Sequence, residues 1–165
     1  MLIETSERLT KALAYAHKMH AGQHRLGGMP YITHPIAVAE DLQMRGADED
    51  TVITALFHDL LEDTNASDDE ILDLGGQKVL EAVRLLTKPE NYRMDDYLGA
   101  ISQNSMAKAV KCADRLHNLK CCHEATVAFQ RKYWMESKKW YVPFFKGTCF
   151  EDDFTQIMDQ LVESI

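Results

Sequence analysis

The stretch Ala55-Leu56-Phe57-His58-Asp59-Leu60-Leu61-Glu62-Asp63 decides how this sequence is read. Apolar residues lie directly before and directly after the pair His58-Asp59. An imidazole and a carboxylate inside an apolar helix cost free energy unless they are paired or bind a metal ion. A lone His-Asp pair is weak evidence, and the acids that follow could form a solvated helix face. Together, however, these residues predict a buried helix that carries an ion-binding pair.

The segments on either side of this stretch predict further helices joined by short loops. Their apolar residues recur at helical spacing, and neither strand alternation nor an internal repeat is visible. The loop 21–30 ends in Gly27-Gly28-Met29-Pro30, which cannot continue a helix. The remaining helices are expected at 6–20, at 34–45, after a cap at Asp48, from a capping box at Ser67–Glu70 to Gly75-Gly76, and at 77–87, 94–101, 105–124, 127–141 and 154–165. The sequence thus predicts an all-α fold, a compact multi-helix bundle in which residues 1–165 form a single domain.

Composition narrows the possible partners. The chain has a hydrophobic fraction of 45%, a charged fraction of 27% and a formal net charge of −8. This charge argues against nucleic acid as a partner. It does not argue against a phosphorylated substrate, because a bound metal ion supplies local positive charge. Aromatic and basic residues mix in 129–146, but a closing helix with a solvated basic face is the preferred interpretation.

The expected location is a reducing cytoplasm. No C-x-x-C pair occurs among the cysteines, and residues 1–7 lack the pattern of a signal peptide. No stretch is long and apolar enough to span a membrane, so no membrane partner is expected. The sequence does not indicate an oligomeric state.

His58 and Asp59 suit a divalent metal ion of borderline hardness. One further histidine and one further aspartate would balance the charge and leave coordination positions for water and a phosphate oxygen. His34 lies at a loop-to-helix junction, and Asp114 lies in Lys111-Cys112-Ala113-Asp114-Arg115-Leu116-His117-Asn118. These two residues are the candidates for the remaining ligands.

Glu62 and Asp63 follow His58 and Asp59 by four residues each, which is about one helical turn. Carboxylates at this spacing lie near the metal ion without having to be ligands. They could orient the attacking water or transfer its proton. For Arg115, next to Asp114, an ion pair and a phosphate contact are both open.

Four blocks of sequence, in this order, resemble the HD-domain phosphohydrolases. Within that family they are most similar to the hydrolase domain of RelA/SpoT-type enzymes and to small alarmone hydrolases. The blocks are His20-Ala21-Gly22-Gln23-His24-Arg25, Pro30-Tyr31-Ile32-Thr33-His34-Pro35, Ala55 to Thr64, and Lys111 to Leu119. The resemblance covers about Leu9 to Pro143.

The resemblance implies a role for each matching residue. It implies metal ligation, usually of manganese, by His34, His58, Asp59 and Asp114. It implies that Glu62 and Asp63 assist the attack of water, and that Arg25 and Asn118 contact the substrate. His20, which flanks the same loop as Arg25, is a further candidate for binding the diphosphate. The implied reaction removes the 3′-pyrophosphate of guanosine tetraphosphate or pentaphosphate, giving GDP or GTP and pyrophosphate.

Other activities remain open. Leu26 and Gly27 stand where the alarmone hydrolases commonly have Lys and Ser, which bears on the choice of base. A second hypothesis is therefore an HD-type phosphatase or phosphodiesterase acting on another nucleotide. A third is a non-catalytic nucleotide-binding module, against which the intact ligand set and acidic pair argue.

Overall fold

The computed structural model describes residues 6–164, and every regular element within them is helical. Among the described residues, the one β-type pairing is an isolated antiparallel bridge between His24 and Pro30. The predicted all-α class is therefore confirmed. The chain divides between Lys111 and Cys112 into two compact units, which are described in turn.

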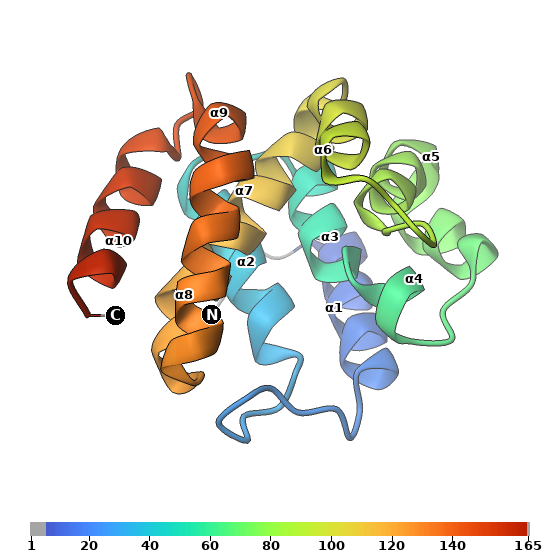
Figure 1. Ribbon diagram of the computed structural model, residues 1–165. Coiled ribbons are helices and arrows are strands. Elements are labelled where there is room, and N and C mark those ends of the chain that lie inside the picture. The colour runs from blue at the N-terminus through green and yellow to red at the C-terminus, as the bar shows by residue number, and fades with distance from the viewer. Residues whose placement is uncertain (1–5, 165) are drawn as a thin grey trace. The chain divides into compact units, whose positions relative to one another are not determined.

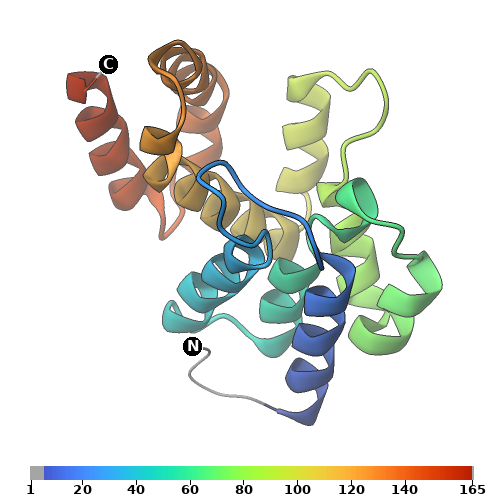
Figure 2. The ribbon, with the colours of Figure 1, turned by 90° about the horizontal axis from the view of Figure 1, so that it is seen from below.

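The first unit is built around α3 (Glu49–Phe57). Figures 1 and 2 show α3 among α1 (Glu7–Met19), α2 (Thr33–Met44) and α5 (Asp68–Leu86). All residues of α3 from Thr51 to Phe57 are buried. The short α4 (Leu60–Asp63) and α6 (Met94–Ser102) complete this unit, and α7 (Ser105–Lys120) begins in it. The quoted stretch thus supplies the central helix of the unit and the turn that follows it.

The predicted helix starts are confirmed by their caps. The side chains of Ser6, Asp48 and Ser67 accept hydrogen bonds from the backbone N–H groups of Leu9, Thr51 and Glu70. At Ser67 the Glu70 carboxylate also accepts from the Ser67 backbone, which completes the capping box. Each cap satisfies backbone donors that the first helical turn leaves open.

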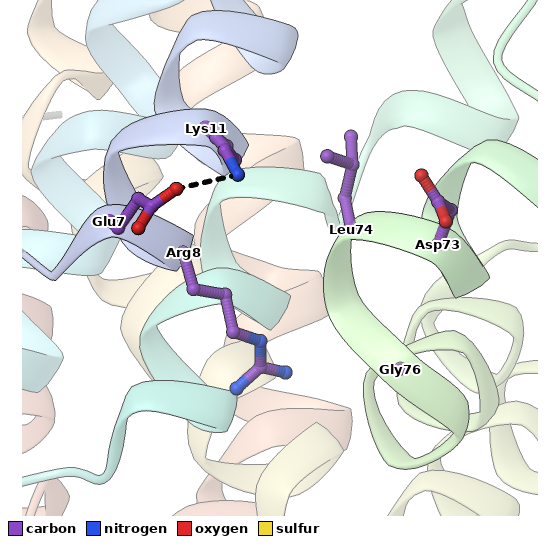
Figure 3. Close-up of a pocket in the computed structure, with 6 residues that line it drawn as sticks. All are labelled: Glu7, Arg8, Lys11, Asp73, Leu74 and Gly76. Carbon is purple, nitrogen blue, oxygen red and sulfur yellow. Dashed lines mark ion pairs between the residues drawn. The ribbon is translucent and has the colours of Figure 1, made fainter.

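Arg8 of α1 connects three helices of the first unit. Its guanidinium bonds Asp50 at 2.6 Å and Glu49 at 3.2 Å on α3, and it donates to the carbonyl oxygen of Gly75 on α5. Arg8 also borders a pocket of about 770 Å³. Figure 3 shows Arg8 extending away from the Glu7–Lys11 ion pair, with Leu74 and Asp73 on the opposite side. None of the site residues predicted from the sequence lines this pocket.

One helix boundary at the predicted metal ligands differs from the expected one, whereas the break at Gly76 agrees with it. The helix capped by Asp48 ends at Phe57 instead of running through Asp63, and α4 starts after a turn at His58-Asp59. In that turn His58 Nδ1 lies 2.7 Å from the Ala55 carbonyl oxygen, a side-chain bond that competes with the helical ladder. At Gly76 the backbone leaves the helical region, at φ 78° and ψ 176°, as expected. A second helical segment follows and runs to Leu86, as predicted for residues 77–87, and the two segments together form α5.

The second unit contains the rest of α7, a 3₁₀ turn (Cys122–Glu124), α8 (Val127–Glu136), a π-helical segment (Ser137–Tyr141), α9 (Val142–Phe145) and α10 (Glu151–Ser164). Figure 1 shows α8 and α10 side by side, and Trp134 Nε1 donates to the Met158 carbonyl across them at 3.0 Å. The rings of Phe145 and Phe154 stack at 4.0 Å. The sequence placed the end of α7 and the start of α10 three or four residues later than the structure does. In the part of the chain that the structure describes, no helix combines the length and the apolarity needed to cross a bilayer.

Candidate metal centre

His34 is presented by the first turn of α2. The turn before it is fixed by Thr33, whose hydroxyl donates to the Pro30 carbonyl at 2.7 Å. The backbone N–H of His34 donates to the Tyr31 carbonyl at 2.9 Å. The His34 side chain is 1% exposed, so an ionisable ring lies in the interior of the first unit.

His58 and Asp59 form the turn between α3 and α4. Because a carbonyl oxygen only accepts hydrogen bonds, the contact between His58 Nδ1 and Ala55 O places the ring hydrogen on Nδ1. In the neutral ring, Nε2 then carries a lone pair. The His58 side chain is 3% exposed and that of Asp59 is 20% exposed.

The three residues converge on one point. Asp59 Oδ2 lies 3.1 Å from His58 Nε2 and 3.9 Å from His34 Nε2, and the two imidazole rings are 5.2 Å apart. One ligand atom from each residue lies within 4.8 Å of the others. A carboxylate oxygen and a neutral Nε2 both carry lone pairs, so their close approach is favourable when a cation lies between them. The donor set therefore fits a divalent metal ion.

Asp114 and Asn118 lie on α7 in the second unit. Asn118 Nδ2 donates to Asp114 Oδ1 at 2.6 Å, and the buried Asp114 carboxylate is thereby oriented from one helical turn away. The structure brings three of the four predicted ligands together, and the fourth, Asp114, belongs to the second unit. In metal sites, carboxylate ligands commonly accept such orienting hydrogen bonds.

The family model described as an HD domain matches residues 12–95, about half of the chain. The chain belongs to the HD-domain family. The matched range includes the cluster His34, His58 and Asp59 and the acidic pair, whereas Asp114 lies outside it.

The relatives of this HD domain include proteins named for alarmone metabolism. A probable guanosine-3′,5′-bis(diphosphate) 3′-pyrophosphohydrolase from Synechocystis is 33% identical over 82% of this chain and 19% of its own length. The corresponding protein of Aquifex aeolicus is 33% identical over 84% of this chain and 21% of its own length. This chain thus spans about a fifth of the length of these curated relatives.

Among solved structures, a metazoan ortholog of SpoT that hydrolyzes ppGpp covers 95% of this chain and 97% of its own. Its TM-score is 0.81 at 28% sequence identity. The resemblance to RelA/SpoT-type hydrolase domains is therefore confirmed.

The two acids of this HD domain have different surroundings. The Glu62 carboxylate accepts from the backbone N–H of Lys88 at 3.2 Å and pairs with its ammonium at 2.9 Å. Asp63 Oδ2 lies 3.2 Å from the Tyr31 hydroxyl. Burial raises the pKa of Asp63, the negative charge of Asp59 raises it further, and the Tyr31 hydrogen bond opposes both effects. Glu62 thus pairs with Lys88, which follows α5, whereas Asp63 lies on the side of the metal cluster.

His20 and Arg25 lie on the loop between α1 and α2. His20 is buried, and its Nδ1 lies 2.7 Å from the Gln23 side-chain oxygen. Within residues 6–164, its Nε2 has no hydrogen-bond partner. Arg25 lies in a narrow turn closed by a bond from its backbone N–H to the Met29 carbonyl, and its side chain is half-buried.

The structure decides between the alternatives for Arg115. Its guanidinium lies 3.7 Å from the centre of the Tyr133 ring and 4.1 Å from that of Tyr141. It also bonds the Ser137 hydroxyl and pairs with Glu136 at 2.9 Å. Arg115 is 5% exposed and its partner Glu136 is about one third exposed, so the guanidinium is the buried member of an ion pair within the second unit.

Sequence reasoning did not single out Tyr31, Gln23 or Lys88. Their contacts with the acidic pair join residues 26 to 40 positions apart, which no local spacing reveals. Nothing in the block Pro30 to Pro35 distinguishes Tyr31 from a core residue.

Proposed function

We propose that this HD domain hydrolyses the 3′-pyrophosphate of guanosine tetraphosphate or pentaphosphate, giving GDP or GTP and pyrophosphate. The observation that carries the proposal is the His34-His58-Asp59 cluster with a carboxylate pair beside it. The names of the Synechocystis and Aquifex relatives and the SpoT ortholog support the choice of substrate. The nucleotide is then the small-molecule partner, and the cysteines, which form no disulfide among the described residues, suit the reducing cytoplasm expected for it.

In this proposal His34, His58, Asp59 and Asp114 hold the metal ion, and the ion is manganese. Two imidazole nitrogens and two carboxylates suit Mn²⁺, although other first-row ions accept the same donors. A divalent ion in such a site supplies a Lewis acid and lowers the pKa of bound water. Asn118 supports the set by orienting the Asp114 carboxylate.

The acidic pair handles the protons. Water attacks the phosphorus that is bonded to the 3′ oxygen, and the bond between these two atoms breaks. Asp63, whose raised pKa brings it nearer to neutral pH, accepts the proton of the attacking water. Asp63 then returns this proton to the 3′ oxygen as that oxygen leaves, while Glu62, held by Lys88, orients the water.

Three further residues bind the nucleotide in this proposal. Arg25 and His20 neutralise the diphosphate, because charge-assisted hydrogen bonds to phosphate are strong. The buried Nε2 of His20 supports this role, since buried polar atoms are normally satisfied and this one has no partner among the described residues. Asn118 contacts the sugar or phosphate next to the Asp114 that it orients.

One assay tests the proposal against its alternatives. Purified protein with Mn²⁺ is given guanosine tetraphosphate and then other nucleotides, and ion-exchange chromatography separates the products. GDP with pyrophosphate is the expected result. Inorganic phosphate from other nucleotides, with no alarmone turnover, would instead support the wider HD phosphatase or phosphodiesterase. Binding without any turnover would indicate a non-catalytic module.

The substitution Asp59→Ala is expected to abolish both metal content and activity. It removes the oxygen that faces both imidazoles, and with it the negative charge that balances the cation. Metal content is measured by elemental analysis after dialysis against Mn²⁺. Asp73→Ala is the matched control, because Asp73 is exposed on α5 and should leave both quantities unchanged. Full activity in Asp59→Ala would show that the metal assignment is wrong.

A further inference from the structure

Tyr31 touches both halves of the candidate site. Its hydroxyl lies 2.6 Å from Asp59 Oδ2 and 3.2 Å from Asp63 Oδ2. The first of these oxygens is the one that faces Nε2 of His58 and Nε2 of His34. A single phenol therefore joins the oxygen at the centre of the metal cluster to the acid beside it.

The position of Tyr31 is fixed on several sides. Its ring lies 4.8 Å from the His20 ring and 6.1 Å from the His34 ring, measured between centres. Its backbone N–H donates to the Gln23 carbonyl at 2.9 Å, and its own carbonyl accepts from His34. A phenol held in this way has little freedom to move its hydroxyl, so the hydroxyl can hold the two carboxylates that it contacts in place.

The same loop also holds the backbone of Asp63. Gln23 Nε2 donates to the Asp63 carbonyl at 2.8 Å, while the Gln23 side-chain oxygen meets His20 Nδ1. The loop from His20 to Tyr31 therefore fixes Asp63 at two points: Gln23 holds its main chain, and Tyr31 lies at its carboxylate. An acid that must meet an attacking water needs this kind of support, because a misplacement of about 1 Å can cost about a hundredfold in rate.

We propose that Tyr31 is a positioning residue that aims Asp59 Oδ2 at the metal ion and sets the distance between this ligand and Asp63. A hydroxyl has one hydrogen, so the two carboxylates share a single donor. The 2.6 Å contact is the shorter of the two and makes Asp59, the metal ligand, the main acceptor, while the 3.2 Å contact is the weaker hydrogen bond that the same hydroxyl makes with Asp63. The inference deepens the proposed function and rests on it for the role of Asp63.

The test is Tyr31→Phe, which keeps the ring and removes the hydroxyl. We expect the Kd for Mn²⁺ to rise about tenfold or more, as measured by calorimetric titration of the metal-free protein without nucleotide. At saturating Mn²⁺ we expect kcat for guanosine tetraphosphate to fall about tenfold, with KM within about twofold of the parent value. Tyr97→Phe is the matched control, since its hydroxyl donates to the buried Leu86 carbonyl at 2.5 Å, away from the cluster. This control should change neither the Kd for Mn²⁺ nor kcat.

Double substitution separates the two parts of the role. In an Asp63→Asn background, Tyr31→Phe should still weaken Mn²⁺ binding but should lower kcat no further, because the acid that it positions is gone. A parent Kd and kcat in Tyr31→Phe, or an equal loss in Tyr97→Phe, would overturn the inference. If the parent protein does not hydrolyse the alarmone but Tyr31→Phe still weakens Mn²⁺ binding, the proposed function fails while the role of Tyr31 toward Asp59 stands.

Discussion

Asp63 is placed where its charge is costly. Burial and the nearby Asp59 raise its pKa, and the Tyr31 hydroxyl compensates only in part. Its neighbour Glu62 has a lysine ammonium at 2.9 Å instead. Two acids adjacent in the sequence thus have opposite electrostatic surroundings.

At this scale we predict that Asp63→Asn stabilises the metal-free protein at neutral pH. A raised pKa means that the folded state binds the Asp63 proton more tightly than the unfolded chain does. Ionising Asp63 therefore costs stability above the raised pKa, and this cost disappears below the ordinary carboxyl value of about 3.9. The Tm of Asp63→Asn should exceed that of the parent at pH 7, and the gain should vanish as the pH falls toward that value.

Asp95→Asn is the control of opposite sign, because the hydrogen bond from Arg93 lowers the pKa of Asp95. Its removal should leave Tm at pH 7 unchanged or slightly lower. A lower Tm for Asp63→Asn at pH 7 would contradict the electrostatic setting described for Asp63.

At the scale of elements, the sequence predicts helix starts well and some interior features poorly. Ser6, Asp48 and Ser67 cap helices through contacts three residues away, which a local pattern reveals. The turn at His58-Asp59 depends on a hydrogen bond from the His58 side chain to the Ala55 carbonyl, which the apolar helical pattern of the sequence does not predict. The π-helical segment Ser137–Tyr141 likewise places the Ser137 hydroxyl and the Tyr141 ring against Arg115, a packing arrangement without a spacing signal.

The kink in α5 gives a prediction about stability. Gly76 has φ 78° and ψ 176°, a region that is almost exclusive to glycine. A Cβ added to Gly76 would have the Arg8 guanidinium, at 3.8 Å, as its nearest neighbour. A side chain there therefore costs free energy through the backbone conformation and not through a steric clash. Gly76→Ala should lower the free energy of unfolding by about 1–3 kcal/mol, as measured by urea denaturation.

Gly99, within the helix α6, provides the contrasting variant. Nothing lies within 4 Å of a Cβ added there. Gly99→Ala should therefore raise the free energy of unfolding by up to about 1 kcal/mol. Equal effects of the two substitutions would show that the Gly76 backbone is not the cause.

At the scale of the whole molecule, the sequence blocks identify the family more readily than they identify the hydrogen bonds and ion pairs within the site. His34 and the His58-Asp59 pair were predicted as ligands from residue type and order, and the structure brings them together. The partners Tyr31, Gln23 and Lys88 depend on how distant segments meet, so they became visible only in the fold. The assignments of Asp114 as a ligand and of residues 1–165 as a single domain remain predictions.

Metal binding should stabilise the folded chain as a whole. A ligand that binds only the folded state at about 100 times its Kd adds about 2.7 kcal/mol. Thermal unfolding with increasing Mn²⁺ should therefore show a rising Tm, and a chelator should reverse it. Asp114→Asn should reduce this gain if Asp114 completes the ligand set, whereas a gain equal to that of the parent would remove Asp114 from the set.

The most direct test of the proposed metal site is to locate the ion itself. Crystals of the protein grown with Mn²⁺ would be measured at wavelengths above and below the manganese absorption edge. We predict one anomalous peak coordinated by Nε2 of His34, Nε2 of His58, Asp59 and Asp114, with Asp63 beside it and outside the ligand set. A peak at another site, or none at these residues at saturating Mn²⁺, would contradict it.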